Sequence, residues 1–190
     1  MKILLLNPPF FKKYSREQRS PGVTKSGTLY FPMWLAYGAA YLEKKGHEIL
    51  LLDAPADDLS YESVEGKGRE YKPELLVVST STPSIYNDVK IAARLKQSLG
   101  GPFTTLVGTH VSACPEESLG FEPSIDAVAR REFETILADL AQALGNGGSL
   151  ASVAGLTYRR NGQIVSNPDA LLLENLDEIP FVSKIYRRFL

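Results

Sequence analysis

Four consecutive hydroxyl side chains, Ser79, Thr80, Ser81 and Thr82, follow the most apolar short run of the chain, residues 75–78. Hydroxyl groups both donate and accept hydrogen bonds, so a row of them suits the amides or the phosphate of a ligand. A structural alternative is that Ser81 or Thr82 caps a helix that begins at Pro83. Capping accounts for one hydroxyl but not for four, so we interpret the row as a candidate binding element.

A second candidate follows the apolar run 105–107, where the chain reads Gly108-Thr109-His110. A backbone without a side chain at Gly108 can approach a ligand closely, although a glycine between a strand and a loop is also common. His110 has no cysteine or histidine at a spacing that would complete a metal site, so we predict no metal ligand here.

A third candidate is the pair Arg130-Arg131, which ends a predicted buried strand over residues 125–129. Because the carboxyl ends of parallel strands meet at one edge of a sheet, we expect these arginines near the hydroxyl row.

Several kinds of site are disfavoured by the residues present. Asn7-Pro8-Pro9 ends the first apolar run where a dinucleotide-binding protein needs glycines, which argues against a nicotinamide oxidoreductase. Asp53 follows the second predicted strand, and we expect it to be solvated. No group of side chains combines a nucleophile, a base and an oxyanion site, so we predict no catalytic residues.

Composition places the chain among ordinary globular proteins. Its 190 residues are 44% hydrophobic and 23% charged, with a formal net charge of −1. This charge gives no reason to expect nucleic acid as a partner, and no apolar run is long enough to predict a membrane span. A single cysteine, Cys114, excludes an internal disulfide framework and fits a cytoplasmic location.

Apolar runs and helical patterns alternate along the chain, which predicts a parallel sheet covered by helices on both faces. The predicted strands lie at residues 2–6, 47–52, 75–78, 105–107 and 125–129, and the predicted helices at 32–45, 60–71, 85–99, from 115 onward, and 132–144. Residues 10–31 form a long loop, which we expect to be mobile and to lie over the carboxyl edge of the sheet. Asn161-Gly162 predicts a β-hairpin over residues 155–165.

These motifs, taken in order, resemble the N-terminal cobalamin-binding domain of class B radical S-adenosylmethionine (SAM) enzymes. The resemblance rests on the opening strand with Asn7-Pro8-Pro9, on the segment 108–117, on the hairpin 155–165 and on the connector sequence at 176–180. It implies a flavodoxin-like, doubly wound, five-stranded parallel sheet in a three-layer α/β/α domain over residues 1–148. Residues 149–190 would form a hairpin and a connector that lead to a radical SAM barrel.

The resemblance implies that cobalamin is the cofactor of this domain and that the barrel is its partner. The hydroxyls at 79–82 would hold the nucleotide tail, and Gly108 and Thr109 would give it room, beside His110. Asn7, Pro8, Pro9 and Phe10, with Arg130 and Arg131, would border the corrin. The parent enzyme would be a methyltransferase or a related carbon-modifying enzyme.

The sequence departs from the family pattern at three places. Arg130-Arg131 replaces a glycine- and glutamate-rich segment, Thr109 replaces a second glycine, and the Asp-x-His-x-x-Gly motif is missing. We therefore expect either a cobalt without a histidine ligand or a cofactor-free interaction or sensor domain of the same fold.

The [4Fe–4S] cluster and S-adenosylmethionine of the family would belong to a separate barrel. One cysteine cannot supply a Cys-x-x-x-Cys-x-x-Cys motif, so we expect that motif downstream of residue 190 and expect this domain not to be catalytic alone.

Overall fold

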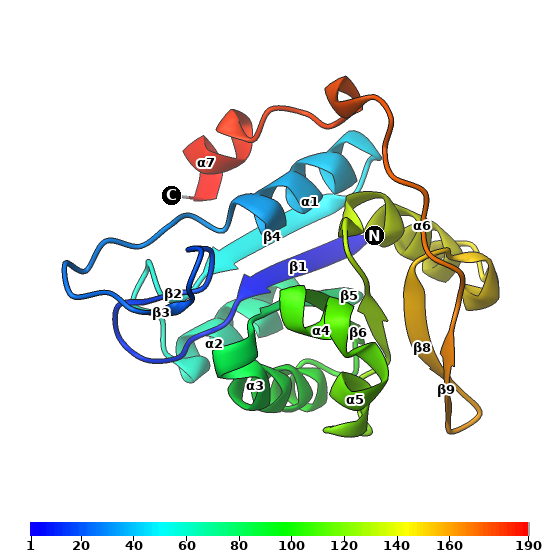
Figure 1. The fold of residues 1–190 in the computed structure, drawn as a ribbon, viewed down its shortest axis with the longest axis horizontal. Helices are drawn as coiled ribbons and strands as arrows, with labels where there is room; N and C mark the ends of the chain where they lie inside the picture. Colours follow the sequence, from blue (N-terminus) through cyan, green and yellow to red (C-terminus); the bar gives the residue numbers. More distant parts are fainter. Residues whose placement is uncertain (190) are drawn as a thin grey trace.

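A seven-stranded sheet forms the centre of the protein in the computed structural model, which describes residues 1–189 (Figure 1). Its strands are β1 (Lys2–Asn7), β4 (Glu48–Asp53), β5 (Leu75–Thr80), β6 (Phe103–Gly108), β7 (Ala127–Ala129), β8 (Leu156–Arg160) and β9 (Gln163–Ser166). The α-helices are α1 (Met33–Lys44), α2 (Tyr61–Tyr71), α3 (Ile85–Ser98), α4 (Thr109–Ala113), α5 (Pro115–Gly120), α6 (Phe133–Gly145) and α7 (Ser183–Phe189). Three short 3₁₀ turns are η1 (Thr82–Ser84), η2 (Leu150–Ser152) and η3 (Leu176–Glu178).

Five of the strands are parallel and lie in the order β4-β1-β5-β6-β7. Numbered along the chain, this order is 2-1-3-4-5, which is that of flavodoxin-like folds. The direction of winding reverses between β1 and β5. Ligands of open α/β sheets bind at such a reversal, beyond the carboxyl ends of the strands.

Both faces of the sheet are covered, which is why its strands are apolar at nearly every position. Successive residues of β1 point to opposite faces, so Ile3 and Leu5 join one core and Leu4 and Leu6 the other. Helices α1, α6 and α7 complete the first core, and α2, α3, α4 and α5 complete the second. Figure 1 shows these two layers above and below the sheet. The predicted three-layer, five-stranded parallel architecture is confirmed.

The predicted hairpin is also confirmed, and it extends the central sheet. Strand β8 pairs antiparallel with β7, and β9 pairs with β8. Leu156 and Tyr158 lie in the same buried core as α6. The hairpin therefore covers the edge of β7, whose backbone groups would otherwise lack ladder partners.

Residues 10–31, called the strap below, connect β1 to α1 and contain the two-residue strands β2 (Tyr14–Ser15) and β3 (Gly22–Val23). In Figure 1 the strap lies beyond the arrowheads of β1 and β4, at the carboxyl edge of the sheet. Three residues in its first part are buried: Tyr14, Ser15 and Arg16 are 2%, 2% and 5% exposed. The expected position of the strap over the carboxyl edge agrees with the structure, whereas its expected mobility stays a prediction.

Candidate functional site

A chain of buried polar side chains begins at the carboxyl end of β1, at the reversal point of the sheet. The Asn7 amide donates from Nδ2 to Asp53 Oδ1 over 2.7 Å. The Arg16 guanidinium donates from Nη1 to Asn7 Oδ1 over 2.8 Å and to the Pro8 carbonyl over 2.6 Å. Asn7 is thus fixed by a strand neighbour on one side and by the strap on the other.

Arg16 also forms an ion pair with Asp88 on the buried side of α3. Arg16 Nη2 and Asp88 Oδ1 are 2.5 Å apart, and the two side chains are 1% and 0% exposed. Asp88 Oδ2 accepts the Ser84 hydroxyl over 2.5 Å, and the Ser81 amide lies 3.4 Å from the same oxygen. This ion pair therefore ties the strap to the segment that follows β5.

The predicted hydroxyl row is divided by the structure into buried and exposed members. Ser79, Thr80 and Ser81 are 6%, 4% and 3% exposed, whereas Thr82 is exposed. Thr80 Oγ1 donates to the Val107 carbonyl over 2.8 Å. The Ser81 hydroxyl lies 2.8 Å from the Tyr14 hydroxyl and 2.7 Å from that of Ser84. Within residues 1–189, neither Ser81 nor Ser84 makes a side-chain cap to a helix backbone.

Burial raises the pKa of three carboxyl groups in or next to the strap. Asp53 is 2% exposed, so the expectation that it is solvated is wrong: the strand end lies under the strap. Desolvation raises the pKa of Asp53 to about 6, against the opposing hydrogen bond from Asn7. Desolvation and the charge of Asp53 raise the pKa of Glu17 to about 7. Desolvation also raises the pKa of Asp88, although Arg16 opposes the shift.

Gly108 serves the packing of the chain itself. Its φ of 122° and ψ of 177° lie in a region reserved for glycine, and an added Cβ would overlap the Thr80 carbonyl oxygen. The room that the missing side chain leaves is therefore filled by β5. Thr109 is exposed and begins α4 with His110, whose Nδ1 is 3.3 Å from Thr82 Oγ1.

Ser112 links the ends of β6 and β7. Its hydroxyl donates to the Gly108 carbonyl over 2.8 Å and accepts the Arg131 amide over 2.7 Å. Arg131 has a φ of 59°, which places this residue in the left-handed region.

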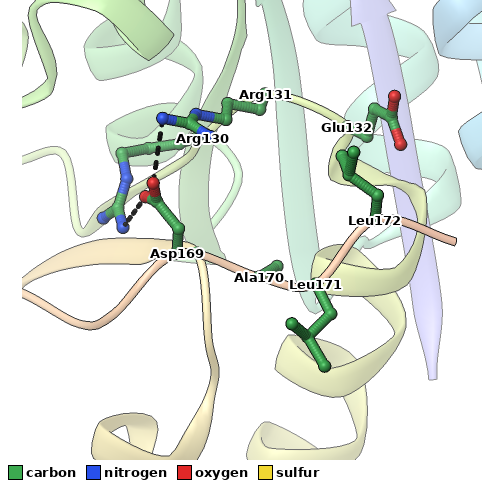
Figure 2. Close-up of a pocket in the computed structure, with 8 residues that line it drawn as sticks. Arg130, Arg131, Glu132, Asp169, Ala170, Leu171 and Leu172 are labelled. Carbon is green, nitrogen blue, oxygen red and sulfur yellow. Dashed lines mark hydrogen bonds and ion pairs between the residues drawn. The ribbon is translucent and has the colours of Figure 1, made fainter.

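The two arginines after β7 turn toward the connector (Figure 2). Arg130 is 8% exposed, and it donates to the Thr157 hydroxyl, the Asn167 carbonyl and Asp169 Oδ1 over 2.6, 2.7 and 3.0 Å. Arg131 Nη2 lies 2.9 Å from the other oxygen of Asp169. These arginines hold the pKa of Asp169 below its usual range. The pair thus fastens the connector to the end of β7.

The prolines and Phe10 lie where the strap begins. The Pro9 carbonyl accepts Asn87 Nδ2 over 3.0 Å, beside the Pro8 carbonyl that Arg16 holds. The Phe10 ring packs edge-on against Tyr14, with centroids 4.8 Å apart. The structure therefore brings residues 7–10 next to Ser81 through the strap, and brings Thr82 next to His110. Arg130 and Arg131 make their contacts with the connector.

Sequence reasoning missed Tyr14, Arg16, Asp88 and Asp169. A signal existed for Asp88, because it lies on the apolar stripe of the predicted helix, between Ile85 and Ala92. An acid on such a stripe needs a buried partner. The strap contains five basic residues that could be that partner, and the sequence alone does not distinguish them.

Two kinds of feature are absent from the described residues, a metal site and a membrane-spanning helix. No group of three or more metal-ligating side chains is arranged to hold an ion within residues 1–189. No helix in the same range has the length and apolarity needed to cross a bilayer.

Comparison with known proteins gives matches over most of the chain. The family model described as B12 binding domain matches residues 19–141. An uncharacterized methyltransferase of Pyrococcus horikoshii is 31% identical over 183 residues, which are 96% of this chain and 38% of that protein. Anaerobic magnesium-protoporphyrin IX monomethyl ester cyclase of Rubrivivax gelatinosus is 29% identical over 184 residues, 94% of this chain and 32% of the cyclase. The chain thus spans about a third of the length of these relatives.

Two solved structures have the same fold. The radical SAM methyltransferase TsrM from Kitasatospora setae, with tryptophan and a SAM analogue bound, superposes with a TM-score of 0.71 at 21% identity, over 88% of this chain and 30% of TsrM. The cobalamin-dependent radical SAM enzyme OxsB, with aqua-cobalamin bound, superposes with a TM-score of 0.75 at 17% identity, over 94% of this chain and 23% of OxsB. At these identities the likeness establishes the fold alone.

Proposed function

The chain belongs to the B12-binding domain family, and we propose that it holds cobalamin at the carboxyl edge of its sheet as the accessory domain of a radical SAM enzyme. The observation that carries the proposal is the family match over residues 19–141. This range includes most of the strap, the hydroxyl row, Gly108-Thr109-His110 and both arginines.

The residues at this edge fit such a cofactor. His110 Nε2 is buried and has no hydrogen-bond partner among residues 1–189, while Nδ1 faces Thr82. A buried nitrogen without a partner is unfavourable, so a ligand group that bonds to it would be stabilised. The hydroxyls of Ser79 to Thr82 are suited to the amides and phosphate of the nucleotide tail.

The remaining candidate residues would surround the corrin in the same proposal. Asn7, Pro8, Pro9 and Phe10 would border the corrin at the reversal point, and Thr109 would lie beside it on α4. Gly108 would act indirectly, since it allows β5 and β6 to approach. Arg130 and Arg131 would border the corrin from the end of β7. Their ion pairs with Asp169 join this strand end to the connector.

Bound cobalamin would supply a cobalt centre able to carry a methyl group, while the protein supplies position and environment. The side chains named above would orient the cofactor and exclude water. We propose the division into a cofactor domain over residues 1–148 and a hairpin with connector over 149–190. The [4Fe–4S] cluster and S-adenosylmethionine would be held by a radical SAM domain that completes a methyltransferase or related enzyme. A cytoplasmic location and the lack of a nucleic-acid partner belong to the same proposal.

The test is a titration of the folded protein with hydroxocobalamin, followed by absorbance. We expect binding with a spectrum that shows no histidine on cobalt. His110→Ala should leave the cobalt spectrum unchanged and weaken affinity about fivefold, which is the effect of one hydrogen bond.

His47→Ala is the matched control, because His47 precedes β4 at the opposite edge of the sheet and contacts the Met1 ammonium. This variant should bind like the wild type. A histidine-ligated spectrum that disappears in His110→Ala would contradict the absence of a cobalt ligand.

The alternative is a cofactor-free interaction or sensor domain. It is favoured by one observation: the strap already satisfies Ser81 and lies against β1 and the segment after β5. Failure to bind hydroxocobalamin, by the folded wild type and by a folded double variant Arg16→Ala/Asp88→Asn, would favour this alternative.

A further inference from the structure

We propose that the strap is a gate: without cofactor, Tyr14 and Arg16 occupy the hydroxyl subsite at the reversal point of the sheet, and cobalamin enters only when they leave. The inference rests on the proposed cobalamin site and adds a means of regulating access to it.

The first argument is position. The reversal point lies between β1 and β5, and Arg16 bridges the segments that follow these two strands. It bonds to Asn7 and Pro8 on one side and to Asp88 on the other. A ligand at the reversal point would meet this guanidinium first.

The second argument is that the strap uses the groups that a polar ligand would need. The Tyr14 hydroxyl is 2.8 Å from the Ser81 hydroxyl, and the tyrosine is 2% exposed. Ser84 completes the arrangement by contacting both Ser81 and Asp88. The strap therefore acts toward Ser81 as an internal ligand, and a nucleotide tail that uses this hydroxyl must replace it.

The third argument is that the strap can move without unfolding the domain. At residues 14–16 its anchors are polar groups and the ring of Tyr14, and water can solvate the polar groups when this part opens; Phe31, at the end of the strap, can stay packed against the first core. Outside β2 and β3 it forms no regular structure, and within the described residues it is not a strand of the central sheet.

The strap also offers groups for a bulky ligand. Three of its large apolar side chains, Phe11, Val23 and Tyr30, are 63%, 58% and 58% exposed. Exposed apolar side chains close to a ligand site can cover a ligand once the segment rearranges. The opened strap would then close again over the cofactor with these residues in contact with it.

Gating has a kinetic consequence. When only the open state binds, the apparent affinity equals the affinity of the open state multiplied by the fraction of protein that is open. The observed rate of binding then cannot exceed the rate at which the strap opens. The rate of hydroxocobalamin binding should therefore reach a plateau as its concentration rises, measured by stopped-flow absorbance.

Two variants loosen the anchors of the strap. Tyr14→Phe removes only the hydroxyl that contacts Ser81, and the plateau rate should rise about fivefold, as for loss of one hydrogen bond. The opened variant combines Arg16→Ala with Asp88→Asn, so that no buried charge is left without a partner. Its rate should rise linearly with concentration, and its unfolding transition verifies that it is folded.

Tyr71→Phe is the matched control, since it also removes one tyrosine hydroxyl bond, the one to the Glu48 carbonyl, but at the first residue of β4, at the opposite edge of the sheet. It should keep the wild-type plateau. Amide exchange gives an independent readout: residues 14–16 should be protected in the free protein and should exchange faster in the opened variant, which lacks the Arg16–Asp88 ion pair.

The outcomes separate the gate from the cofactor proposal. A linear rate in the wild type, with Tyr14→Phe unchanged, would overturn the gate while leaving cobalamin binding intact. Binding by the opened variant but not by the wild type would support a closed gate. No binding by either folded protein would overturn both proposals.

Discussion

Gly108→Ala tests whether the glycine at the end of β6 is needed by the protein itself. The residue has a φ of 122° and a ψ of 177°, and an added Cβ would overlap the Thr80 carbonyl oxygen and lie 3.1 Å from Thr80 Oγ1. Thr80 is its register partner across β5 and β6. The new side chain could be accommodated only if the two strand ends moved apart.

The magnitude follows from two effects. Backbone in this glycine-only region destabilises other residues by about 1–3 kcal/mol. Separation of the strand ends would weaken a neighbouring hydrogen bond, which contributes about 1 kcal/mol. Together these predict that the free energy of unfolding falls by roughly 2–4 kcal/mol. For a chain of this length the melting temperature should fall by roughly 4–16 °C.

Thermal and urea unfolding followed by circular dichroism would measure this effect. Gly66→Ala is the matched control, because Gly66 lies inside α2 with open space around the position of a Cβ. That substitution should stabilise the protein by about 0.5–1 kcal/mol. A Gly108→Ala protein within about 0.5 kcal/mol of the wild type would refute the packing argument, as half a kcal/mol is typical of neutral surface changes.

Two further predictions concern the buried charges. Arg16→Ala should lower the free energy of unfolding by about 3–5 kcal/mol in a urea titration, because it leaves Asp88 buried without its partner. Arg69→Ala is the control, since it breaks an exposed ion pair and should change the free energy of unfolding by less than about 1 kcal/mol. Equal effects of the two substitutions would contradict the argument. Because burial raises the pKa of Asp53 from 3.8 to about 6 and that of Glu17 from 4.5 to about 7, the folded protein binds these protons more tightly than the unfolded chain. Stability should therefore fall as pH rises from about 4 to about 7, and Glu17→Gln should flatten the upper part of this decline; an unchanged slope in denaturant titrations would exclude Glu17 as the cause.

The architecture was predictable from the sequence because local patterns specify it. The uninterrupted apolar run at residues 2–6 requires burial on both faces, and Pro32, Gly46 and Asn161-Gly162 mark where helices and turns must begin or end. Such signals depend only on residues that are neighbours in the sequence, so they can be recognised without knowledge of the fold. The carboxyl-edge location of the candidate residues follows from the same reading, because parallel strands end at one edge.

The side-chain partnerships needed the tertiary structure. Arg16 and Asp88 are 72 residues apart, and the strap contains other basic residues that the sequence alone ranks equally. The burial of Asp53 and the packing beside Gly108 also depend on distant segments, because the strap covers the carboxylate and β5 fills the space beside the glycine.

The sequence by itself determined that five strands alternate with helices and that polar residues end those strands. Only the tertiary structure decided which of these residues face a ligand and which are held by the chain, because burial and pairing depend on segments far apart in sequence. Ser81 illustrates this: the sequence marks its hydroxyl as a candidate ligand group, and the structure shows that hydroxyl hydrogen-bonded to Tyr14, 67 residues away.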